Sequence, residues 1–187
     1  SLVDACRLSR ARVVVAPHSD VDAVEATLAG RSEERALVLT DSVFSTDGGL
    51  APLRQLHEVC RRHRAVLLVD AAPALGVRGA GGRGLVHEAG LAGSPDVVMT
   101  VTLSKSLGSQ GGAVLGPTAV RDHLVDSARP FIFDTGLAPA AVGSALAALR
   151  VLIDEPWRAE TVLAHARTLA SVCDVPETPE SAVVSVI

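Results

Sequence analysis

Short apolar runs, rich in valine and leucine, alternate along the chain with longer stretches of helical periodicity. The short runs predict strands at residues 12–16, 36–40, 65–70, 97–102 and 113–115. The periodic stretches predict helices at residues 20–29, 52–63, 118–127 and 139–153. Strands that are nearly all apolar and separated by helices are typical of a mostly parallel sheet covered by helices. The predicted fold class is therefore α/β.

The pattern changes near Glu155 and Pro156, where a long helix over residues 158–172 is predicted, followed by a proline-containing turn and a final strand. We therefore predict a large domain at 1–150 and the start of a smaller domain at 151–187. The chain opens without methionine and in a helix-like pattern, and it ends on an apolar run. From these two ends we expect an internal fragment of a longer protein.

Composition and charge narrow the classes of function. The hydrophobic share of 48% and the charged share of 20%, with a mean hydropathy of +0.36, are typical of a compact globular chain. Aromatic residues make up 2% and the net charge is -4, which argues against a nucleic-acid partner. No apolar run reaches membrane-spanning length, and the three cysteines form no CxxC pair or disulfide framework. We therefore expect no membrane partner and a cytoplasmic location.

Polar side chains follow the predicted strands where those strands end. Asp70 closes one strand, Thr102 closes another, and Ser104 and Lys105 come directly after it. Lys105 is the only lysine of the chain. The other side chains that stay positively charged at neutral pH are arginines. In open parallel sheets, ligands bind beyond the carboxyl ends of the strands, so these four residues are candidates for one site.

A lysine, a carboxylate and hydroxyls are the groups that pyridoxal phosphate needs. The lysine forms a Schiff base with the aldehyde, the carboxylate keeps the pyridinium nitrogen charged, and hydroxyls and backbone N–H groups hold the phosphate. Lys105, Asp70, Thr102 and Ser104 fit these roles. The alternatives are a surface lysine in a loop and a capping aspartate at a strand end. The glycines of residues 79–84 are read as a turn, since no strand–GxGxxG–helix context surrounds them.

Four segments together resemble the α-oxoamine synthases, which are fold-type-I pyridoxal-phosphate enzymes. They are TDSVFSTDGGLAPL (40–53), VLLVDAAPALGVRGAGGRG (66–84), TLSKSLGSQGG (102–112) and FIFDTGLAPAA (131–141). The resemblance implies the large domain of that fold and a condensation of an amino acid with an acyl-CoA thioester, with release of CO2 and CoA. The branch nearest to these motifs serves biotin biosynthesis and joins L-alanine to pimeloyl-CoA or pimeloyl-acyl carrier protein.

The resemblance also implies roles for individual residues. Lys105 would carry the cofactor and later act as a proton-transfer base, and Asp70 would pair with the pyridinium nitrogen. Thr102 and Ser104 would hold the phosphate, and Ser45 would lie near the phenolic oxygen. Thr135 would reach the phosphate of a neighbouring subunit, because active sites of the family are shared across a homodimer.

Two positions depart from the family pattern. Where the family has an acidic residue after the aspartate and then a histidine that contacts the phenolic oxygen, this chain has Ala71 and Pro73. The family's glycine-rich phosphate turn and ring-stacking histidine are expected upstream of residue 1, and its substrate-carboxylate arginine downstream of residue 187. Three alternatives stay open: another α-oxoamine synthase such as glycine C-acetyltransferase, an aminotransferase-like enzyme, and a non-catalytic paralogue.

Overall fold

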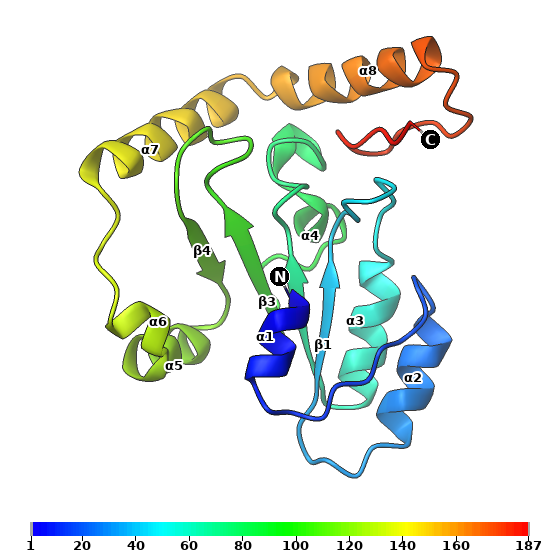
Figure 1. The fold of residues 1–187 in the computed structure, drawn as a ribbon, viewed down its shortest axis with the longest axis vertical. Helices are drawn as coiled ribbons and strands as arrows, with labels where there is room; N and C mark the ends of the chain where they lie inside the picture. The colour runs from blue at the N-terminus through cyan, green and yellow to red at the C-terminus, as the bar shows by residue number, and fades with distance from the viewer. Residues whose placement is uncertain (1, 187) are drawn as a thin grey trace.

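The computed structural model describes residues 2–186 and has a sheet flanked by helices (Figure 1). The strands are β1 (Leu37–Asp41), β2 (Val66–Asp70), β3 (Val97–Thr102) and β4 (Gly112–Leu115). The helices are α1 (Leu2–Leu8), α2 (Val21–Ala29), α3 (Leu53–Arg62), α4 (Leu85–Glu88), α5 (Thr118–Ser127), α6 (Arg129–Ile132), α7 (Pro139–Asp154) and α8 (Trp157–Val172), with a 3-10 turn at Ala80–Gly82.

The sheet has the order β1-β2-β3-β4. Strands β1, β2 and β3 are parallel, and β4 pairs antiparallel with β3. The carboxyl ends of the three parallel strands therefore lie along one edge, to which α8 and the C-terminal segment are adjacent (Figure 1). This edge is where the fold class places ligands.

The hydrophobic core lies between the sheet and the helices on one of its faces. Leu67 and Val69 of β2 are fully buried, and they pack in one cluster with Val59 and Cys60 of α3. Helix α3 is amphipathic, because its apolar residues recur every three or four positions while its arginines face solvent. Helix α2 begins after its N-cap Asp20, whose carboxylate accepts the Ala23 N–H at 2.9 Å.

The sequence predictions of most elements are confirmed. The four strands of the sheet and helices α2, α3, α5, α7 and α8 lie within two residues of their predicted bounds. Pro52 is the N-cap of α3 and not its first helical residue. The short helices α4 and α6 were not predicted, since each is a single turn without a periodic pattern.

Two predicted strands are wrong. Residues 12–16 have no regular secondary structure and pair with no strand in the described part of the chain. Val15 is 88% exposed, and the Arg12 guanidinium pairs with the Glu33 carboxylate at 2.5 Å. An apolar run without a partner strand cannot satisfy its backbone groups in a ladder. Residues 181–186 also form no strand. That segment instead packs on the turn after β1, where the Ser185 hydroxyl donates to the Thr46 carbonyl.

Helix α7 runs without a break through residue 150, and the chain turns at Glu155 and Pro156 before α8 begins. The division into domains at 1–150 and 151–187 stays a prediction. Among residues 2–186, no helix combines the length and the apolar character that crossing a membrane requires.

Candidate functional site

The last residues of β1 and β2 bring two carboxylates together. Asp41 and Asp70 are paired in register, and Asp70 is paired with Thr100 of β3 on its other side. Register partners on parallel strands project to the same face of a sheet, so both carboxylates lie on one face at the carboxyl edge. Thr102 lies two residues beyond Thr100 and closes β3 on that same face.

The backbone at this edge is fixed by a buried serine. Ser42 is fully buried; its N–H donates to the Asp70 carbonyl at 2.8 Å and its Oγ donates to the same oxygen at 3.0 Å. The Asp70 side chain accepts the Ala72 N–H at 3.0 Å through Oδ1. Its second oxygen makes no hydrogen bond within residues 2–186, so it can accept one from a ligand.

Lys105 lies in the loop that follows β3. The loop is closed by two backbone bonds: the Leu103 N–H donates to the Gly111 carbonyl at 2.9 Å, and the Gly108 N–H donates to the Lys105 carbonyl at 2.9 Å. In the described part of the chain the Lys105 amine has no hydrogen bond and no ion pair. A lysine that the fold leaves unpaired is available for a ligand or a substrate.

Lys105 also lines a groove of about 760 Å³ between the loops after β2 and β3, helices α7 and α8, and the C-terminal segment. The loops meet closely where Gly76 passes Ser106: at Gly76, with φ +81°, an added Cβ would collide with the Ser106 side chain. The lining residues are Ala72, Pro73, Leu75, Gly76, Val77, Lys105, Ser106, Ala148, Val151, Leu152, Arg158, Val162, Ala182 and Val183.

Two hydroxyls stand together at the end of β3. The Oγ1 of Thr102 and the Oγ of Ser104 are 2.7 Å apart, and Thr102 Oγ1 accepts the Ser104 N–H at 3.2 Å. Hydroxyls beside a glycine-containing turn can donate to phosphate oxygens. The side chains of the two residues predicted to hold a phosphate are therefore adjacent.

Asp41 belongs to the same electrostatic environment, and the sequence reasoning missed it. Burial raises the pKa of Asp41, the neighbouring Asp70 carboxylate raises it further, and Lys105 lowers it. Asp41 thus lies within the electrostatic reach of both Asp70 and Lys105. Its position as the last residue of a strand beside a strand ending in Asp70 was the signal that could have identified it.

The remaining predicted residues, Ser45 and Thr135, are both exposed. Ser45 is exposed in the turn after β1, whose ends are joined by the Phe44 N–H donating to the Gly49 carbonyl at 2.9 Å. Thr135 is exposed in the segment between α6 and α7, and its N–H donates to the Asp134 side chain at 2.8 Å. The structure does not bring Thr135 together with Lys105 through any contact within residues 2–186.

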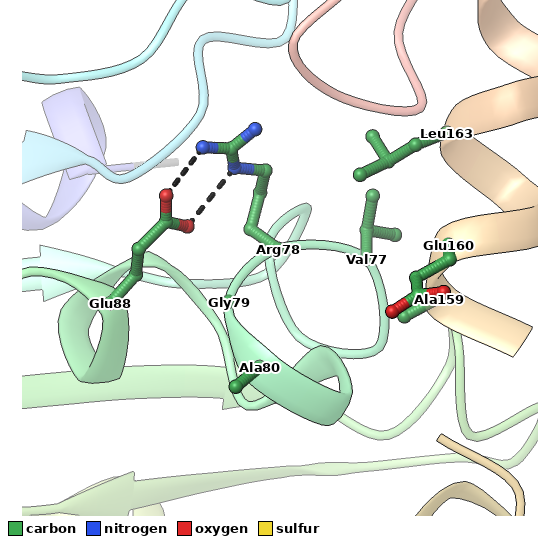
Figure 2. Close-up of a pocket in the computed structure, with 8 residues that line it drawn as sticks. All are labelled: Val77, Arg78, Gly79, Ala80, Glu88, Ala159, Glu160 and Leu163. Atoms are coloured by element: carbon green, nitrogen blue, oxygen red, sulfur yellow. Dashed lines mark hydrogen bonds and ion pairs between the residues drawn. The ribbon is translucent and has the colours of Figure 1, made fainter. Parts of the chain in front are cut away.

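A second, smaller cavity of about 280 Å³ lies between the turn after β2 and α8. Figure 2 shows that its arginine, Arg78, is bound to Glu88 by two hydrogen bonds, at 2.6 and 3.2 Å. Arg78 also donates to the Glu180 carbonyl at 3.0 Å. Its charge is already compensated, so this arginine joins three segments of the fold and is not a free binding group.

Comparison with known protein sequences gives close relatives. A protein of Mycolicibacterium vanbaalenii, named 8-amino-7-oxononanoate synthase, is 75% identical over 187 residues, which are 100% of this chain and 49% of the relative. A protein of Mycobacterium avium with the same name is 78% identical over the same share of each chain. The chain spans about half the length of the curated relatives it matches.

Solved structures agree with the predicted fold. Serine palmitoyltransferase of S. paucimobilis superimposes with a TM-score of 0.91 at 30% identity, over 100% of this chain and 50% of that one. The 8-amino-7-oxononanoate synthase of Francisella tularensis gives a TM-score of 0.77 at 25% identity, over 98% of this chain and 53% of that one. The resemblance to α-oxoamine synthases and the fold-type-I architecture are thereby confirmed. Because the model of aminotransferase class I and II matches residues 1–187, the chain belongs to that family.

Proposed function

We propose that the protein containing this chain is a pyridoxal-phosphate-dependent acyltransferase of the 8-amino-7-oxononanoate synthase type. It would condense L-alanine with pimeloyl-CoA or pimeloyl-acyl carrier protein, with loss of CO2, in biotin biosynthesis. Relatives at 75% and 78% identity carry that name. The serine palmitoyltransferase neighbour was solved with a pyridoxal phosphate–myriocin aldimine bound.

One observation carries the proposal: the only lysine of the chain makes no hydrogen bond or ion pair within residues 2–186, and it lines a groove together with Ala72 and Pro73, which closely follow Asp70 at the end of β2. A structural lysine would be expected to find a carboxylate partner or to extend into solvent away from any cavity. Asp70 offers a free carboxylate oxygen, and Thr102 and Ser104 offer adjacent hydroxyls. This donor set fits pyridoxal phosphate.

The residues that would hold the cofactor are those the sequence predicted. Lys105 would bond to its aldehyde carbon, Asp70 would accept the pyridinium N–H, and Thr102 with Ser104 would bind the phosphate. Ser45 would contact the phenolic oxygen. Pyridoxal phosphate, when bound, supplies an electron sink for the carbanion at the amino acid Cα.

The chain's own groups would perform the proton chemistry. The Lys105 amine, once released from the cofactor, would take the proton from Cα of L-alanine and later return one to the product. Arginine could not replace it, because a guanidinium stays protonated in proteins. The Lys105 side chain is exposed at the groove, so the amine is accessible to a substrate that binds there.

A second candidate is a non-catalytic paralogue that keeps the fold. Pro73 lines the same groove as Lys105 and has no polar side-chain atom, where the family has a histidine. This single observation favours loss of an acid–base partner. The two candidates differ in turnover and not in cofactor binding, since Lys105 and Asp70 are present in both.

We further propose a homodimer with shared active sites, in which Thr135 reaches the phosphate of the neighbouring subunit, and a cytoplasmic location. Thr135 is exposed, so its side chain is accessible for such a contact. L-alanine and the acyl thioester would be the small-molecule partners.

The test is an assay of the full-length protein with L-alanine and pimeloyl-CoA, following CoA release. Turnover, together with borohydride fixation of the cofactor to Lys105 located by mass spectrometry, would support the enzyme. Fixation to Lys105 without turnover would favour the non-catalytic paralogue. Absence of any fixed cofactor would contradict both.

A further inference from the structure

We propose that Arg158, the second cation of the groove that Lys105 lines, recognises the distal carboxylate of the acyl substrate. This inference rests on the proposed function and deepens it, because it names the residue that would select the acyl chain. The groove would take a carboxyl-terminated chain in preference to a methyl-terminated chain of the same length.

The chemistry of the groove walls is the first support. Among the residues that line it, Lys105 and Arg158 are the only charged ones, and Ser106 is the only other one with a polar side chain. The rest of the lining is apolar, with Leu75 from the loop after β2, Leu152 from α7 and Val162 from α8 among its larger side chains. A ligand that matches this lining has an apolar middle and needs a cation beyond its reacting end.

The product named by the relatives has that shape. In 8-amino-7-oxononanoate the amine and ketone stand at one end, a carboxylate stands at the other, and methylene groups lie between them. With its reacting end at Lys105, the methylenes would lie against the apolar walls. The carboxylate would then need a positive partner, and Arg158 is the remaining cation of the groove.

The guanidinium of Arg158 has more N–H donors than its contact with Glu155 uses. Its Nε and Nη2 bond to one oxygen of Glu155, at 2.9 and 2.7 Å, and its guanidinium stacks over the Trp157 ring at 5.0 Å. A guanidinium has five N–H donors, so several are left for a second carboxylate. Arg158 and Val162 are four residues apart on α8 and therefore share one helix face, which is the face toward the groove.

Glu155 competes for the same guanidinium, since it is a negative group beside the position proposed for the substrate carboxylate. Neutralising it should strengthen binding of a carboxyl-terminated chain. The pair thus gives variants with opposite expected effects, so a folding defect in one does not decide the outcome.

The experiment measures kcat/KM of the full-length holoenzyme for pimeloyl-CoA and for heptanoyl-CoA, which has the same chain without the distal carboxylate. Arg158→Ala should lower kcat/KM for pimeloyl-CoA by roughly tenfold and leave heptanoyl-CoA unchanged. Glu155→Gln should raise kcat/KM for pimeloyl-CoA alone. Arg167→Ala, on the same helix but outside the groove lining, is the matched control and should change neither value.

A second measurement does not need turnover: calorimetric binding of pimelate and of heptanoate to the same proteins. Weaker pimelate binding by Arg158→Ala, with heptanoate unaffected, supports the proposal. Equal losses for both acids, no change in either, or no pimelate binding to the unmodified protein overturn it. If neither thioester is consumed but pimelate binding depends on Arg158, the proposed reaction fails and the carboxylate site stands.

Discussion

Asp41 and Asp70 occupy the last paired position of β1 and β2, so that two carboxylates project from the same face at the edge of the sheet. Neighbouring strands are separated by about 4.8 Å, which is close enough for the two charges to interact. Burial and the Asp70 charge raise the pKa of Asp41, and Lys105 opposes them. This edge therefore carries more negative than positive charge, and a cationic group such as a pyridinium N–H would be favoured there.

The first prediction concerns the pH dependence of stability. A carboxyl pKa that is raised in the folded state costs stability as the pH rises above its ordinary value of 3.8, because the unfolded chain then loses the proton first. Asp41→Asn should therefore raise the free energy of unfolding of the cofactor-free full-length protein at pH 7, and the gain should shrink as the pH approaches 3.8. Urea denaturation at several pH values measures this. Asp126→Asn, at an exposed position on α5, is the control and should show no such trend.

The second prediction concerns the lysine. Lys105→Arg keeps the positive charge but cannot bond covalently to an aldehyde or release a proton near neutral pH. We expect the variant to fold, to lose the visible absorbance of covalently held pyridoxal phosphate, and to lose turnover. Absorbance spectra and borohydride trapping measure this. A cofactor that is still fixed covalently in the variant would disprove the assignment of Lys105.

The third prediction concerns the place where the loops after β2 and β3 meet. It compares the cost of a positive φ alone with the cost of a positive φ combined with a steric collision. Gly76→Ala places a methyl group against Ser106 and also imposes a positive φ on a residue with a side chain. We expect a loss of about 2–4 kcal/mol in the free energy of unfolding. Gly90→Ala has a similar φ, +75°, with nothing within 4 Å of the new methyl, and should lose only about 1 kcal/mol. Equal losses of unfolding free energy in the two variants would contradict a collision at Gly76, because only the positive φ is common to both.

The fourth prediction restores the family pattern beside Asp70. Changing Ala71→Glu and Pro73→His together returns a hydrogen-bond donor to the groove that Lys105 lines. Cofactor affinity should rise by about tenfold, as expected for one hydrogen bond to a charged oxygen, and turnover should rise more. Equilibrium titration with pyridoxal phosphate and steady-state kinetics measure the two effects. Unchanged turnover would mean that another residue already fills the role of the histidine.

The control for this prediction is the single variant Pro73→His. Ala71 is 1% exposed, so the glutamate of the double variant could cause a folding defect, and the single variant separates that defect from a chemical effect.

The fifth prediction concerns thiol chemistry. Burial raises the pKa of Cys60 to about 11, and this side chain of α3 is fully buried in the core. At pH 8 it should react with a disulfide reagent only on unfolding, whereas Cys6 and Cys173 are partly exposed and should react sooner. Mass spectrometry of the labelled peptides assigns the order. Rapid labelling of Cys60 in the folded protein would contradict the described packing of this core.

The pattern of apolar residues alone predicted the four strands of the sheet and the long helices. In such elements the buried face sets the spacing of apolar residues along the whole length. It failed at residues 12–16, where the valines have the composition of a strand but no partner in the described residues. Whether an apolar run joins a ladder depends on what lies beside it, and local composition does not contain that information.

The sequence predicted those site residues that have a polar or reactive side chain at, or just after, the end of a predicted strand. These are Asp70, Thr102 and Lys105. Asp41 was missed because the sequence shows that it follows a predicted strand, but the register of β1 against β2 is what pairs it with Asp70. Arg158 was missed for a similar reason: it enters the groove only because α8 lies beyond the carboxyl edge of the sheet.

The Ser42 bonds have a consequence for how freely this region can change its sequence. Both the N–H and the hydroxyl of Ser42 bind the Asp70 carbonyl, so the strand end is held by its backbone. The loop that follows can therefore drift in sequence while Asp70 stays where it is. Ala71 and Pro73 thus stand on a backbone that begins from a fixed point, and Ser42 is the side chain that fixes it.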